Sequence, residues 1–111
     1  MRKILFLSLI SLIFVVACQK KHETIYIVST NDIHATIDAM PELATLVKGL
    51  EAQGEVLLVD SGDRVSGNPY VDDAEVSGMP IIDLMNAVGY DLVTLGNHEF
   101  DKGSESLKAM I

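Results

Sequence analysis

The chain has 111 residues, which is enough for one small domain. It carries 16 acidic and 8 basic residues, a formal net charge of −8, and such a surface disfavours nucleic-acid polymers and anionic lipid head groups. A single cysteine excludes a disulfide framework within one chain.

The N-terminus has the features of a secretory signal. A basic start, Met1-Arg2-Lys3, precedes thirteen uncharged residues (4–16, ILFLSLISLIFVV) and the small residue Ala17. The apolar stretch from Ile4 to Cys18 has fifteen residues, fewer than the ~20 that a membrane-spanning helix needs. We therefore expect residues 1–17 to be a signal peptide that directs export.

The end of this apolar stretch carries the only cysteine. Residues 15–18, VVAC, resemble a bacterial lipoprotein box, in which the cysteine is lipidated and becomes the first mature residue. This resemblance implies a lipid anchor on Cys18, a tether over residues 18–23, and attachment to a bacterial membrane on the periplasmic or cell-surface side. Gln19 resembles a signal for the outer membrane. The alternatives are a plain signal peptide or an uncleaved anchor with an incidental cysteine.

Loss of residues 1–17 would make the chain more acidic. The 8 basic residues include Arg2 and Lys3, so 6 would remain against 16 acidic residues, a net charge of −10. Such a chain repels a phosphate ester unless its binding site contains strong positive charge.

The remaining residues alternate between two periodicities. Short β-branched runs predict strands, and apolar residues at helical spacing predict helices that begin near a proline and end near a glycine. The predicted strands are residues 25–28, 55–60 and 91–95. The predicted helices are residues 41–54, 79–89 and a third that begins at Ser104. The predicted core stripes are Leu43, Leu46, Val47, Leu50, Ile81, Leu84, Met85 and Val88.

This order indicates parallel β-α-β units and therefore an α/β fold. Only residues 61–78, rich in Gly, Asp and Ser, interrupt the alternation. A loop of this length in a small domain tends to be functional.

Polar side chains follow each predicted strand. They are Asn31, Asp32 and His34 after the first, Asp60 and Asp63 after the second, and Asn97, His98, Glu99 and Asp101 after the third. Because the carboxyl ends of parallel strands lie at one edge of a sheet, we expect the three clusters to meet there.

The chemistry of these side chains suits divalent metals such as Zn or Mn, which bind carboxylate, imidazole and amide oxygen. Asp32 and His34, two residues apart, would point to the same side of an extended segment. Asp63 could bridge two ions, and Asn97 could bind the second. Two ions would clamp a phosphoryl group and offset the acidic charge of the chain.

Two further residues are candidates for acid–base chemistry. His98 could contact phosphate oxygens or protonate the leaving group, and Asp101 could orient its ring. The alternatives are structural. Asp32 and Asp63 could cap turns, His34 could be a surface residue, and Asn97 could occupy a turn with positive φ. Glu99 and Asp60 are expected to be structural.

Three motifs, NDIHA, DSGD and LGNHEFD, resemble those of the calcineurin-like metallophosphoesterases. Residues 24–103 are similar to the secreted 5′-nucleotidase branch, which includes UDP-sugar hydrolases and 2′,3′-cyclic-nucleotide phosphodiesterases. The resemblance implies part of a metallophosphoesterase β-sheet sandwich with two divalent metal ions. It also implies site roles, with Asp32, His34, Asp63 and Asn97 as metal ligands and His98 and Asp101 as a catalytic dyad.

The chain departs from the family in two ways. Ala35 stands where the family usually has glycine, which matters only if the backbone there needs positive φ. Family members are also several hundred residues long, with further histidine ligands and a nucleoside-binding domain downstream. We therefore expect residues 24–111 to be the N-terminal part of the catalytic domain, truncated, weak in metal binding and nearly inactive alone.

The expected activity of the complete protein is hydrolysis of nucleotide phosphate esters. Two alternatives stay open. The substrate could be a cyclic nucleotide or a UDP-sugar, or the chain could be a non-catalytic surface lipoprotein remnant.

Overall fold

A parallel three-stranded sheet forms the centre of the fold. The computed structural model describes residues 24–111. Its strands are β1 (Ile25–Thr30), β2 (Glu55–Asp60) and β3 (Leu92–Val93), in the order β1-β2-β3. The register pairs Ile25 with Glu55 and Val59 with Leu92. The predicted α/β fold is confirmed, although β1 is two residues longer than predicted and β3 is reduced to two residues.

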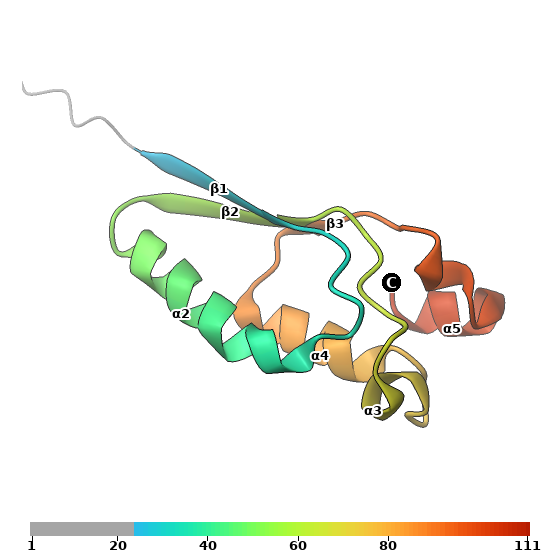
Figure 1. Cartoon of the computed structure of the whole chain (residues 1–111). Helices are drawn as coiled ribbons and strands as arrows, with labels where there is room; N and C mark the ends of the chain where they lie inside the picture. Colours follow the sequence, from blue (N-terminus) through green and yellow to red (C-terminus); the bar gives the residue numbers. More distant parts are fainter. Residues whose placement is uncertain (1–23) are drawn as a thin grey trace, which may run out of the picture.

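The longer helices α2 (Met40–Glu51) and α4 (Met79–Val88) lie on one face of the sheet (Figure 1). A proline stands in the first turn of each helix, where its missing N–H costs no hydrogen bond. Gly89 ends α4 with φ 97°, a conformation that glycine adopts without steric cost. The shorter helical segments are η1 (Ile37–Ala39), α3 (Pro69–Asp72), η2 (His98–Phe100) and α5 (Gly103–Ala109).

The predicted loop 61–78 contains one of these segments. Helix α3 begins after Asn68, whose side-chain oxygen accepts a hydrogen bond from the Tyr70 N–H at 3.0 Å. The Asn68-Pro69 pair is thus a capping residue followed by an N1 proline. A segment of four residues is too short for the periodicity to predict it.

The core lies between the sheet and the helices. Val47, Leu58, Ile81 and Met85 are buried, as the core stripes predict for the helical positions. Leu46 is the exception, because it lies at the margin of its stripe and is 53% exposed. The prediction of a core position was wrong there.

The opposite face of the sheet is open. Ile25, Ile27, Leu57 and Leu92 all point to it, and each is at least 41% exposed. Residues 24–111 therefore supply one sheet and its helical layer, which is consistent with a partial metallophosphoesterase fold.

No helix between residues 24 and 111 combines the length and the apolar character that crossing a membrane requires. The predicted signal peptide (1–17), the tether (18–23) and the lipidation site Cys18 lie outside the described residues.

Candidate metal and catalytic site

The loops after β1 and β2 run side by side beyond the sheet. The backbone N–H of Asp32 donates to the Gly62 carbonyl at 3.1 Å, and that of His34 donates to the Asp63 carbonyl at 3.0 Å. The loop after β3 also reaches them, because the His98 N–H donates to Asp63 Oδ1 at 2.8 Å. The three loops that carry the polar clusters therefore meet at the carboxyl edge of the sheet, where Figure 1 shows the loops after β1 and β2 side by side.

The loop that carries Asp32 and His34 is not extended. Both residues have positive φ, 50° and 46°, so the expectation of an extended segment was wrong. The left-handed backbone nevertheless brings the side chains together, with His34 Nε2 3.8 Å from Asp32 Oδ1. Ala35 also has positive φ, 55°, where a side chain costs roughly 1 kcal/mol or more. Its methyl group is fully buried in the core.

Asn97 lies against Asp63. Its amide is best oriented with the nitrogen 3.2 Å from Asp63 Oδ2 and the oxygen 3.3 Å from the His98 N–H. Both oxygens of Asp63 thus face the loop after β3. No group of three His, Cys, Asp or Glu side chains within residues 24–111 converges as a complete metal site.

The two histidines of the site are neighbours. The rings of His34 and His98 are 4.9 Å apart and inclined at 70°. His34 Nδ1 lies 3.0 Å from the Ser66 carbonyl oxygen, and His98 Nδ1 lies 2.7 Å from Asp101 Oδ2.

The pair formed by His98 and Asp101 is electrostatically coupled. The hydrogen bond to Asp101 raises the pKa of His98, and the same bond, followed by one from the Ser66 hydroxyl at 3.0 Å, lowers the pKa of Asp101. Both shifts favour the charged pair. An imidazolium at the rim of the site can bind an anion or release a proton to a leaving group.

Glu99 is buried beneath this rim. It is 1% exposed, and its carboxylate accepts backbone hydrogen bonds from Asp63 at 3.0 Å, Arg64 at 2.9 Å and Gly96 at 2.5 Å. These bonds join the loops after β2 and β3, which is a structural role.

A second buried ionic group lies under the loop after β2. Asp60 Oδ2 accepts from Arg64 Nε at 3.3 Å and from the Gly62 N–H at 3.0 Å, and its Oδ1 accepts from the Thr30 hydroxyl at 2.8 Å. Arg64 Nη2 donates to the Thr94 carbonyl. Neither charged side chain is exposed to solvent.

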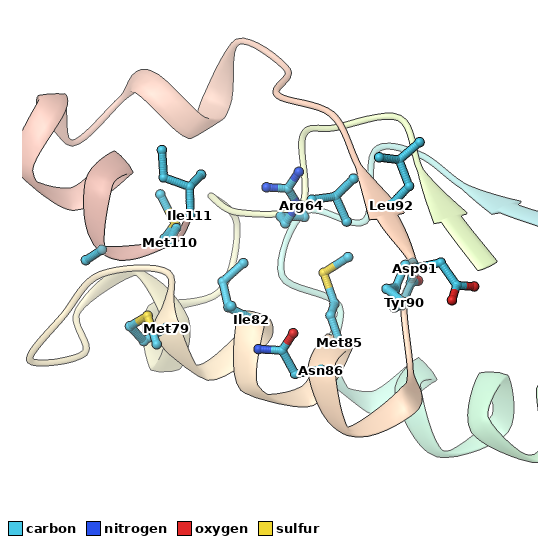
Figure 2. Close-up of a pocket in the computed structure, with 12 residues that line it drawn as sticks. Arg64, Met79, Ile82, Met85, Asn86, Tyr90, Asp91, Leu92, Met110 and Ile111 are labelled. Carbon is cyan, nitrogen blue, oxygen red and sulfur yellow. The ribbon is translucent and has the colours of Figure 1, made fainter. Parts of the chain in front are cut away.

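Arg64 also borders a cavity of about 510 Å³ between α4, β3 and the last residues of the chain (Figure 2). Most of the other lining side chains are apolar, among them Ile82 and Met85 on α4 and Met110 near the C-terminal end of the chain. Arg64 Nη1 has no hydrogen-bond partner within residues 24–111.

Comparison with known proteins assigns the chain to a family. The family model described as calcineurin-like phosphoesterase matches residues 25–110. The chain belongs to the calcineurin-like phosphoesterase family. This result agrees with the family resemblance of the three motifs, and the family typically uses divalent metals.

Curated relatives of the chain include nucleotide hydrolases. A trifunctional nucleotide phosphoesterase of Bacillus subtilis is 37% identical over 78 residues, covering 69% of this chain and 5% of the relative. The 5′-nucleotidase of Bos taurus is 35% identical over 99 residues, covering 73% of this chain and 17% of the relative. A 2′,3′-cyclic-nucleotide 2′-phosphodiesterase/3′-nucleotidase of Haemophilus influenzae is 35% identical over 112 residues, covering 81% of this chain and 17% of the relative.

Solved structures support the same fold. A Staphylococcus aureus protein described as a 5′-nucleotidase superposes with a TM-score of 0.63 at 23% identity, over 78% of this chain and 20% of that one. The 5′-nucleotidase of Candida albicans gives a TM-score of 0.55 at 26% identity, over 71% of this chain and 17% of that one. The chain thus spans at most about a fifth of the length of these relatives.

Proposed function

We propose that residues 24–111 are the N-terminal part of the catalytic domain of a metal-dependent phosphoesterase that hydrolyses nucleotide phosphate esters. The observation that carries this proposal is the meeting of three loops at one sheet edge, with Asp32, His34 and Asp63 on two of them and Asn97 on the third. Family membership and the names of the nucleotide-hydrolysing relatives support it.

The donor set fits two divalent ions, Zn, Mn or a similar metal. Asp32 and His34 would hold the first ion, Asp63 would lie between the two, and Asn97 would hold the second. Carboxylate, imidazole and amide oxygen are all ligands for such metals. When bound, the ions supply positive charge for the phosphoryl group and an activated water. Because residues 24–111 contain no complete cluster, further ligands would come from other parts of a longer protein.

His98 and Asp101 complete the proposed site. His98 would contact a phosphate oxygen or give its proton to the leaving group. Asp101 would hold the ring through the 2.7 Å contact with Nδ1 and keep the imidazolium charged. Nε2 is then the nitrogen that faces the substrate.

A chimeric enzyme tests the proposed function. Residues 25–110 would replace the matching segment of a 5′-nucleotidase relative, and phosphate release from a nucleoside 5′-monophosphate would be measured with Mn²⁺. We expect metal-dependent turnover, lost with chelator and with Asp63→Asn, and reduced about 10²-fold or more in kcat by His98→Asn.

Exposed Glu105, which pairs with Lys108 at 2.8 Å, provides the control, because Glu105→Gln also removes one carboxylate. Turnover that survives both chelator and Asp63→Asn would overturn the proposal. Thermal unfolding of each variant separates loss of chemistry from loss of fold. A parallel assay with a 2′,3′-cyclic nucleotide would decide whether the substrate class extends to diesters, as in the relative from Haemophilus influenzae.

We also propose that the chain is exported and anchored through a lipid on Cys18, after cleavage behind Ala17. The support is the sequence of residues 1–18 alone. In a bacterial host fed a labelled fatty acid, we expect the wild-type chain to take up label and to fractionate with membranes. Cys18→Ser should abolish the label, and labelling that persists in this variant would refute the anchor site.

A further inference from the structure

We infer that Ser66 is a positioning residue that couples the metal-side histidine His34 to the pair formed by His98 and Asp101. No motif in the sequence singles it out. Ser66 contacts both groups, through its backbone carbonyl on one side and its hydroxyl on the other. The role in catalysis rests on the function proposed above, but the geometry and its test do not.

The carbonyl of Ser66 selects the tautomer of His34. A carbonyl oxygen can only accept, so the 3.0 Å contact requires a proton on His34 Nδ1. In the neutral ring, the lone pair is then on Nε2, the nitrogen that lies 3.8 Å from Asp32 Oδ1. Fixing a histidine through its other nitrogen is how outer-shell groups commonly orient a metal ligand.

The hydroxyl of Ser66 fixes Asp101. It donates at 3.0 Å to Oδ2, the same oxygen that lies 2.7 Å from His98 Nδ1. Two donors therefore converge on one carboxylate oxygen, and the Ser66 hydroxyl limits the rotation of the Asp101 side chain. The orientation of His98 depends in turn on that carboxylate. Since the two rings are only 4.9 Å apart, one residue sets the geometry of both.

The backbone of Ser66 is held in place for this task. Its φ of 68° is left-handed, which disfavours a residue with a side chain unless neighbouring contacts compensate. Asp72 in α3 supplies those contacts, because Oδ1 accepts from the Ser66 N–H at 3.1 Å and Oδ2 accepts from the next two backbone N–H groups at 2.9 and 3.1 Å. Asn68 Nδ2 also donates to the Ala35 carbonyl at 3.2 Å, which ties the turn to the His34 loop.

Two substitutions separate the two contacts. Ser66→Gly removes the hydroxyl but keeps the carbonyl and suits a positive φ, so it should disturb His98 and leave His34 unchanged. Asp72→Ala releases the turn and should disturb His34. Asp73→Ala is the matched control, because Asp73 is the exposed neighbour of Asp72.

The readout is the ring tautomer, from long-range ¹H–¹⁵N NMR spectra of the metal-free chain at a pH where imidazole rings are neutral. In the wild type we expect both rings to carry the proton on Nδ1. Ser66→Gly should lower the Nδ1–H to Nε2–H ratio of His98 by roughly twofold to fivefold, the effect of weakening one hydrogen bond. Asp72→Ala should bring His34 towards the tautomer mixture of free imidazole.

A His34 ring protonated on Nε2 in the wild type would overturn the inference, as would wild-type His98 spectra in Ser66→Gly. If Asp72→Ala prevents folding, the glycine variant alone decides. The measurement uses neither metal nor substrate, so an inactive chimera would not count against Ser66. Wrong tautomers would likewise leave the proposed hydrolase function standing.

Discussion

Replacement of Glu99 by glutamine is expected to destabilise the chain by about 3 kcal/mol at neutral pH, or to unfold it. Three backbone N–H groups from two loops donate to this carboxylate, which is 1% exposed. Glutamine offers one oxygen and directs an NH₂ group at donors that need an acceptor. Buried donors left without an acceptor cost about 1–3 kcal/mol each.

The loss should depend on pH. Burial raises the pKa of Glu99, but the backbone donors of Arg64, Asp63 and Gly96 outweigh it and lower the pKa below its ordinary value. A carboxyl group with a lowered pKa stabilises the fold above the pKa of the unfolded chain, about 4.3. That stabilisation disappears as the pH falls through the pKa of the folded state. The free energies of unfolding of the wild type and of Glu99→Gln should therefore converge in strongly acidic solution.

Urea unfolding followed by circular dichroism at pH 7 and in acid measures both effects. Glu105→Gln is the control, because Glu105 is exposed and its 2.8 Å contact with Lys108 is an ordinary surface pair. Equal midpoints for wild type and Glu99→Gln at pH 7 would contradict the assignment of Glu99 as the residue that joins the two loops.

Neutralising Asp60 should destabilise the chain to a similar extent as Glu99→Gln, but for a different reason. Asp60→Asn leaves the Arg64 guanidinium buried without its partner, and breaking a buried pair in this way costs about 3–5 kcal/mol. Asparagine retains an oxygen for the Thr30 hydroxyl, but its NH₂ group replaces the oxygen that accepts from the Gly62 N–H, so the loss combines an unpaired charge with one unmatched donor.

The double variant Asp60→Asn/Arg64→Met isolates the pair. Removing both charges should restore a large part of the stability that Asp60→Asn loses, because methionine suits the apolar cavity next to Arg64. A double-mutant cycle from urea unfolding gives the coupling energy. Additive losses would show that the two side chains do not depend on one another.

The regular elements could be predicted because their causes are local. Strand β2 has the predicted bounds, and α4 differs from its predicted bounds by one residue at the C-terminal end. The prediction of α4 is accurate because the apolar period, the proline and the glycine all indicate the same helix. The short length of β3, two residues, could not be predicted. Leu92 and Val93 have strand propensity, but the number of paired residues depends on β2 and on Arg64, which holds the Thr94 carbonyl.

The site, like the fold, has a part that the sequence predicts and a part that it does not. The meeting of Asp32, Asp63 and Asn97 follows from the parallel topology, which strand–helix alternation already indicates. The contacts of Ser66 that orient His34 and His98 do not follow from any local pattern. Ser66 acts through a positive φ and through hydrogen bonds to residues 32 and 35 positions away, which appear only once the chain is folded, and Asp72 holds it through contacts across four to six residues.

The residues with a left-handed backbone around the site carry a steric penalty that substitution cannot relieve without loss of their side chains. Asp32, His34 and Asp63 all have positive φ, and glycine would relieve the steric penalty at each position. It would also delete a side chain of the donor set. Selection for thermal stability alone should therefore act against the left-handed backbone at these three positions, whereas the proposed metal site requires their side chains, so stability and the proposed metal binding make opposing demands on the same residues.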